Sequence, residues 1–132
     1  MDRPVTESET TVRTGEADLP GNLNLPETPC GVVLFAHGSG SSRLSPRNRY
    51  VAQQLNRAGI ATLLFDLLTE QEHRRDSFTA ELRFDISLLT RRLAGAVDWA
   101  GGQTALEALP IGLFGASTGA AAALTVAAQM PE

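Results

Sequence analysis

The sequence has little cysteine and little positive charge. Cys30 is its single cysteine, so no disulfide can form within the chain, and we expect a protein of the reducing cytoplasm. Lysine is absent: all 11 basic residues are arginines, against 15 acidic residues, and the formal net charge is −4. Because there is no basic excess to attract phosphate groups, nucleic acid is not an expected partner.

Long apolar runs are absent as well. Residues 1–10 contain no apolar core, so they do not resemble a secretory signal. No apolar run approaches the roughly 20 residues that cross a bilayer, so we expect no membrane partner. The composition, 42% hydrophobic and 20% charged among 132 residues, is typical of a single globular domain.

Short apolar runs mark the expected strands. Continuous runs at 31–36, 60–65 and 111–114 predict strands that are buried on both faces, as in a parallel sheet. Nearer the N-terminus, 10–14 and 17–25 predict two strands joined in a hairpin.

One helix is expected directly after the first buried strand and its loop. Ser45 is a good N-cap, Pro46 suits the first turn, and Gly59 ends the helix. Its inward face is expected to consist of three apolar residues: Val51, Leu55 and Ala58.

Helical spacing continues further along the chain. Apolar residues from Leu82 to Val97 recur at helical intervals and predict a long helix that ends near 99–101. An alanine-rich helix is expected at 120–128, and the charged stretch 69–76 is expected to be an exposed loop. Alternating strands and helices predict an α/β fold: a mainly parallel sheet, helices on both faces and an antiparallel N-terminal hairpin.

The pentapeptide Gly115-Ala116-Ser117-Thr118-Gly119 carries the strongest functional signal. It stands between an expected strand and an expected helix, which is the context of a nucleophile elbow. The turn lifts the Ser117 hydroxyl above the sheet, and Gly115 and Gly119 leave room for it. The backbone N–H of Thr118, at the start of the helix, is then one expected oxyanion donor. A helix-capping serine without chemistry is the alternative interpretation of Ser117.

A second loop is expected beside this turn. His37-Gly38-Ser39-Gly40 follows the first buried strand, and its glycines allow the backbone to approach a substrate carbonyl. We expect the Ser39 N–H to be the second oxyanion donor and His37 to order the loop through hydrogen bonds. A plain Gly/Ser turn is the alternative.

These motifs resemble the dienelactone-hydrolase-like branch of the α/β-hydrolase superfamily. The matching stretches are 32–43, the 61–68 strand with Asp66, and 113–120, within a likeness that runs from about Thr10 to the end. The resemblance implies hydrolysis of esters, lactones or related small acyl substrates, without a metal or organic cofactor. Similar domains also occur fused to phosphoribosyltransferase domains, but this chain has no acidic-pair phosphoribosyl-binding stretch.

The sequence departs from the superfamily after the nucleophile. In the superfamily the catalytic triad runs in the chain order Ser, then an acid, then His. The 15 residues after Ser117 contain one acidic residue, Glu132, and no histidine. We therefore expect a single hydrolase domain over 1–132 that is incomplete at its C-terminal side, and weak or inactive by itself. The strand at 111–114 would be an unpaired edge, which favours dimerisation or aggregation.

Other polar residues receive lesser roles. Asp66, at a strand end, is a candidate for the pocket or for ordering the loop. His73 lies in a charged cluster that we expect to be solvated, and Asp98 is expected to be a surface charge. Cys30 is expected to be a small filler residue rather than a nucleophile.

Two further functions stay open. A dinucleotide-binding module is suggested by Gly38-x-Gly40 after a strand, but Arg43 occupies the third glycine position of that fingerprint. A non-catalytic interaction protein built on half of a hydrolase fold is the other alternative.

Overall fold

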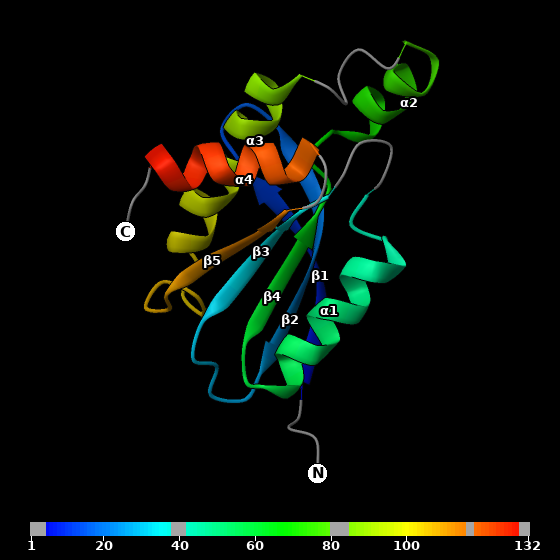
Figure 1. The fold of residues 1–132 in the computed structure, drawn as a ribbon. Helices are drawn as coiled ribbons and strands as arrows, with labels where there is room; N and C mark the ends of the chain where they lie inside the picture. The colour runs from blue at the N-terminus through cyan, green and yellow to red at the C-terminus, as the bar shows by residue number, and fades with distance from the viewer. Residues whose placement is uncertain (1–4, 38–41, 80–84, 116–117, 130–132) are drawn as a thin grey trace.

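The protein forms a twisted five-stranded sheet with helices on both faces (Figure 1). The structure, a computed structural model, describes residues 5–37, 42–79, 85–115 and 118–129. The elements in chain order are β1 (Val5–Arg13), β2 (Asp18–Pro26), β3 (Val32–Ala36), α1 (Pro46–Arg57), β4 (Ala61–Phe65), α2 (Glu70–Thr79), α3 (Ile86–Gly101), β5 (Ile111–Gly115) and α4 (Thr118–Gln129).

The sheet has the order β1-β2-β4-β3-β5. β1 and β2 form an antiparallel hairpin, and β2 pairs antiparallel with β4. β3 pairs parallel with both β4 and β5. The expected mainly parallel sheet with an antiparallel N-terminal hairpin is confirmed, although β1 begins five residues earlier than predicted, at Val5 rather than Thr10.

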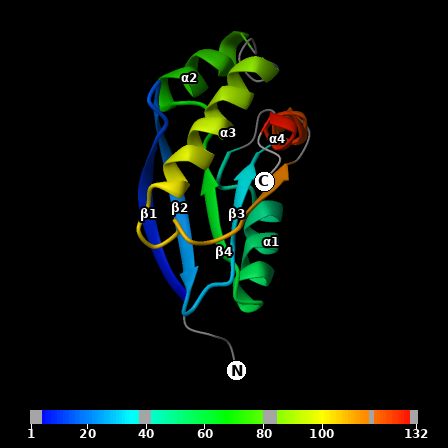
Figure 2. The ribbon, with the colours of Figure 1, turned by 90° about the vertical axis from the view of Figure 1, so that its left-hand side faces the viewer.

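Two apolar layers enclose the sheet. Figure 2 shows α1 and α3 on opposite sides of it. The larger core lies between the sheet and the α3–α4 side, and includes Leu34, Leu63 and Leu93. The smaller core lies under α1 and is built on Phe35, Leu64 and Ala52.

The first predicted helix is present, and its inward face agrees in part with the prediction. Ser45 caps α1 by accepting a hydrogen bond from the Asn48 N–H, with Pro46 in the first turn, as the sequence indicates. Val51 and Leu55 are half-buried and pack against the smaller core as predicted, whereas Ala58 is exposed. The fully buried residues of α1 are Asn48, Ala52 and Asn56, which were not expected. Burial of Asn56 is compensated because its Nδ2 donates to Ile60 O and Thr62 Oγ1.

The segment 69–76 was expected to be an exposed loop, and that prediction is wrong. Most of it belongs to α2, and Asp76 is buried. The helix start is a capping box: the Thr69 hydroxyl accepts from the Glu72 N–H, and the Glu72 carboxylate accepts from the Thr69 N–H. The following helix, α3, begins at Ile86 with Asp85 as its N-cap, so its start is later than the predicted Leu82.

β5 lies at the edge of the sheet that the described residues form. The sequence predicts a strand buried on both faces, yet Ile111 and Gly112 are exposed and the rest of β5 is half-buried. β5 is less buried than predicted because no described strand lies on its outer side. Among the described residues, no helix is long and apolar enough to pass through a lipid bilayer.

Candidate active site

The two candidate loops leave the sheet side by side. β3 and β5 are parallel neighbours, and Ala36 pairs with Gly115 at their carboxyl ends. Parallel strands deliver the segments that follow them to the same edge of a sheet, which is where α/β folds bind ligands. The His37 loop and the elbow therefore start from adjacent points (Figure 1).

Several predicted site residues lie outside the described residues. These are Gly38, Ser39 and Gly40 of the first loop and Ser117 of the elbow. Thr118 and Gly119, the last two residues of the pentapeptide, begin α4, as the nucleophile-elbow pattern requires. The roles of Ser117, Ser39 and the Thr118 N–H remain predictions.

His37 is fixed at the start of the first loop. Its side chain is buried, with 5% of the residue exposed. Its Nε2 accepts a hydrogen bond from the Leu67 N–H at 2.9 Å. A nitrogen that accepts from a backbone amide has its lone pair engaged, so this atom is poorly placed to take a proton from Ser117. The contact supports the prediction that His37 orders the loop.

Asp66 fixes the other end of the same loop. It is 6% exposed, and its Oδ1 accepts from the Arg43 backbone N–H at 2.8 Å. Its Oδ2 pairs with the Arg43 guanidinium, also at 2.8 Å. The loop between His37 and Arg43 is thus attached at both ends to consecutive residues, Asp66 and Leu67, that follow β4. Of the two roles considered for Asp66, this geometry favours loop ordering.

His73 was expected in a solvated charge cluster, and the structure places it elsewhere. It is half-buried on α2, and its ring stacks on His37 with centroids 6.1 Å apart. Its Nε2 is buried and has no hydrogen-bond partner among the described residues. α2 therefore lies close to the start of the candidate loop, a relationship that the sequence did not indicate.

Among the residues that the structure describes, His37, Asp66 and His73 form a group that could hold a metal ion, with one donor atom each within 4.8 Å of the others. The existing hydrogen bonds argue against that use. His37 Nε2 is engaged by the Leu67 N–H, and both Asp66 oxygens are engaged by Arg43. A guanidinium beside the carboxylate also repels a cation. The cluster fits a hydrogen-bonded loop anchor better than a metal site.

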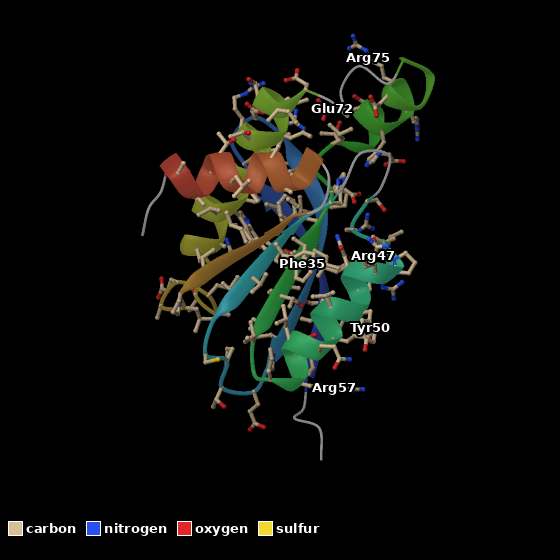
Figure 3. The ribbon with its side chains drawn as sticks, in the orientation of Figure 1. Phe35, Arg47, Tyr50, Arg57, Glu72 and Arg75 are labelled. Carbon is tan, nitrogen blue, oxygen red and sulfur yellow. The ribbon has the colours of Figure 1, made fainter. Side chains whose placement is uncertain are left out.

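A buried arginine holds α2 against the rest of the molecule. Arg92 of α3 donates to the Glu72 carboxylate through both terminal nitrogens, to Glu16 and to the Leu67 carbonyl. Hydrogen bonds from Arg92 lower the pKa of Glu72 to about 2. They also lower the pKa of Glu16, and the same contacts raise the pKa of Arg92. Glu72 lies on α2 near the top of Figure 3.

Comparison with known proteins identifies the architecture. No protein-family model matches the chain. The crystal structure of a dienelactone hydrolase from Anabaena variabilis superposes with a TM-score of 0.94 and 55% identity, covering 96% of this chain and 59% of that one. The chain has the fold of the dienelactone-hydrolase-like α/β hydrolases, over the N-terminal part. Est1E from Butyrivibrio proteoclasticus shares this fold at a TM-score of 0.75 and 18% identity, over 92% of this chain and 46% of that one.

A curated relative is longer still. A Mycobacterium tuberculosis protein named "Putative phosphoribosyl transferase" is 52% identical over 128 residues. These are 97% of this chain but 28% of the relative. The chain thus spans less than a third of that protein and about three fifths of the Anabaena hydrolase.

Sequence reasoning missed two parts of the site. Arg43 was noted in the matching stretch and as the residue that breaks the dinucleotide fingerprint, but not as a partner of Asp66, because a contact between the segments after β3 and β4 leaves no local pattern. The Arg92–Glu72 pair was missed for the same reason. By contrast, α2 had a local signal, since Thr69 and Glu72 have the spacing of a capping box.

Proposed function

We propose that this chain is part of a serine hydrolase acting on small ester, lactone or related acyl substrates. Ser117 is the nucleophile, and the backbone N–H groups of Thr118 and Ser39 stabilise the oxyanion. The observation that supports this most is the pairing of Ala36 with Gly115, which starts both loops at adjacent points. The likeness to the Anabaena dienelactone hydrolase, at 55% identity, supports the substrate class.

The remaining loop residues have a supporting role in this proposal. His37 and Asp66 hold the two ends of the loop to which Ser39 belongs. Gly38 and Gly40 let its backbone approach the substrate. Preorganised donors stabilise developing charge without reorganisation during the reaction, which is why anchoring the loop matters for rate.

The general base comes from outside these 132 residues in the proposed mechanism. No histidine follows Ser117 in the sequence, and His37 Nε2 is engaged by Leu67. A serine with an oxyanion hole but no base retains only a small residual rate. The 132-residue chain is therefore expected to be weak or inactive by itself.

The test is covalent labelling by a fluorophosphonate. The 132-residue chain is compared with a chimera that continues into the C-terminal part of the Anabaena hydrolase. We expect labelling of the chimera only, abolished by Ser117→Ala and unchanged by Ser87→Ala, a change of an exposed serine. Strong labelling of the 132-residue chain that His37→Ala abolishes would contradict an external base. Labelling that survives Ser117→Ala would overturn the proposal.

The name of the mycobacterial relative suggests another activity, phosphoribosyl transfer. This chain corresponds to 28% of that protein, and it contains no acidic-pair phosphoribosyl-binding stretch. Hydrolysis is the better proposal for this segment. A non-catalytic interaction role is a second candidate, because β5 lies at an edge of the described sheet and Leu124 of α4 is 74% exposed.

A further inference from the structure

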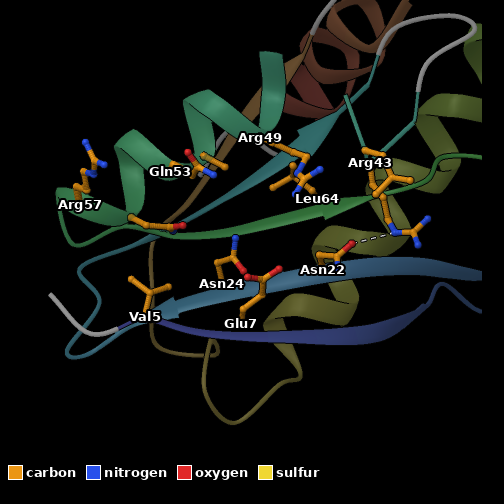
Figure 4. Close-up of a pocket in the computed structure, with 12 residues that line it drawn as sticks. Val5, Glu7, Asn22, Asn24, Arg43, Arg49, Gln53, Arg57 and Leu64 are labelled. Carbon is orange, nitrogen blue, oxygen red and sulfur yellow. Dashed lines mark hydrogen bonds between the residues drawn. The ribbon is translucent and has the colours of Figure 1, made fainter. Parts of the chain in front are cut away.

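A polar groove lies between α1 and the antiparallel side of the sheet. Its volume is about 370 Å³, within the range of small-molecule sites. The floor comes from β1, β2 and β4, and the wall comes from α1 and the segment before it (Figure 4). None of its lining residues belongs to the proposed nucleophile or oxyanion set.

The floor of the groove carries two asparagines on one face of β2. Asn22 and Asn24 are two residues apart, so both side chains point toward α1, although asparagine is uncommon in strands. Asn22 Oδ1 accepts from Arg43 Nε at 2.9 Å. Asn24 Oδ1 is buried and has no hydrogen-bond partner among the described residues. A buried acceptor without a partner is destabilising, so this atom calls for a donor.

The charges in the groove are separated along its length. Figure 4 shows Arg43 and Arg49 toward one end, whereas Glu7 lies beside Asn24 on the strand side. Glu7 and Asn24 are register partners in the hairpin, so their side chains share a face. Arg57 lies on α1 toward the far end. One end therefore offers guanidinium donors, and the middle offers oxygen acceptors.

We propose that this groove binds a small phosphorylated sugar or polyol. Guanidinium groups match the geometry of phosphate oxygens, so Arg49 receives the phosphate, whereas the Arg43 guanidinium is already held by Asp66 and Asn22. The hydroxyl groups of the ligand donate to Asn24 Oδ1 and to the Glu7 carboxylate, which only accept at neutral pH. An unphosphorylated sugar cannot make the contacts to arginine, and inorganic phosphate cannot make the hydroxyl contacts to Asn24 and Glu7. The ligand needs both features to bind well.

The test is isothermal titration calorimetry of the 132-residue chain with glucose 6-phosphate, glucose and inorganic phosphate as probes. We expect glucose 6-phosphate to bind at least about tenfold more tightly than either of the other two. The affinity for glucose 6-phosphate should fall as salt rises, since Arg49 is exposed to solvent. Glu7→Gln should weaken the binding of glucose 6-phosphate less than Arg49→Gln does, because the glutamine side chain keeps an acceptor oxygen.

Two arginine variants on α1 distinguish binding in the groove from non-specific charge attraction. Arg49 lines the groove, whereas Arg47 is exposed on the same helix outside it, toward the upper end of α1 in Figure 3. Arg49→Gln should weaken binding of glucose 6-phosphate about tenfold or more, and Arg47→Gln should leave it within about twofold. Equal effects of the two variants would show non-specific charge attraction and overturn the proposal. Absence of binding at millimolar glucose 6-phosphate, or equal binding of inorganic phosphate, would also overturn it.

Discussion

Arg92 of α3 and Glu72 of α2 form a two-pronged ion pair, in which Arg92 Nη2 lies 2.8 Å from Glu72 Oε2 and Nη1 donates to Oε1. The Arg92 side chain is buried, and it also pairs with Glu16 in the turn between β1 and β2. One guanidinium thus joins α2, α3 and the hairpin. A buried charge that loses its partners is strongly destabilising, so the position of α2 depends on this pair.

The first prediction concerns Glu72→Gln. Because the pKa of Glu72 is lowered from 4.5 to about 2 in the folded state, its ionised form stabilises the fold at neutral pH. That stabilisation is fully present above about pH 4.5 and is lost as the pH falls toward 2. Since Glu72 is partly solvent-exposed, we expect Glu72→Gln to lower the free energy of unfolding by about 2 kcal/mol at pH 7.

Urea denaturation at several pH values checks this prediction. The difference between wild type and Glu72→Gln should shrink below pH 4.5. The control is Glu70→Gln, two residues away, whose exposed pair with Arg74 should contribute less than about 0.5 kcal/mol. A difference that stays constant between pH 7 and pH 3 would show that the carboxylate charge is not the cause.

The second prediction concerns the close approach of α3 to the hairpin. A Cβ added at Gly95 would lie 2.6 Å from the Thr14 Cβ, closer than non-bonded carbons can approach. Gly95→Ala should therefore destabilise the protein by about 1–3 kcal/mol in thermal or urea unfolding, despite the better helix propensity of alanine. Gly101→Ala is the control, because nothing lies within 4 Å of its added Cβ. A stabilised Gly95→Ala variant would contradict the packing.

The third prediction concerns the anchor of the candidate loop. In Asp66→Ala the Arg43 N–H loses its acceptor, so its hydrogen exchange should accelerate about tenfold or more. Hydrogen exchange of the Leu67 N–H, which donates to His37, should change less. Asp98→Ala, at an exposed position of α3, is the matched control. Unchanged exchange at Arg43 would show that Asp66 does not hold the loop.

The fourth prediction concerns the β5 edge and α4. Ile111 is 36% exposed and Leu124 is 74% exposed, and α4 packs on β5. We expect the 132-residue chain to self-associate with rising concentration in analytical ultracentrifugation. Leu124→Glu should reduce this association, whereas Tyr50→Glu, at an exposed aromatic on α1, should not. A monomeric wild type, or equal effects of both variants, would contradict the prediction.

The sequence was sufficient where short-range rules decide the structure. The apolar runs at β3 and β4 and the Ser45 cap of α1 depend on neighbouring residues, and these predictions are confirmed. Val51 and Leu55 pack inward from α1 as predicted, but the burial of Asn48 and Asn56 was not predictable in this way. Asn56 is buried because Ile60 and Thr62 accept from it, and those partners are set by the tertiary structure.

In the candidate site, too, some relationships could be predicted from the sequence and others could not. The order of β3 and β5 in the sheet follows from the resemblance to a known fold, and the pairing of Ala36 with Gly115 agrees with it. The contact of His73 with His37 does not follow from the sequence, since the polar residues of α2 show no apolar period. Long-range hydrogen bonds, such as Arg43 to Asp66, depend on where strands end in space.

Leu67 connects two parts of the molecule through its own peptide groups. Its N–H donates to His37, and its carbonyl accepts from Arg92 at 3.2 Å. A shift of this one residue changes both contacts together, so substitutions at His37 and Arg92 should show non-additive effects on stability. We therefore expect the loop of the proposed active site to be energetically coupled to the ion pair that holds α2.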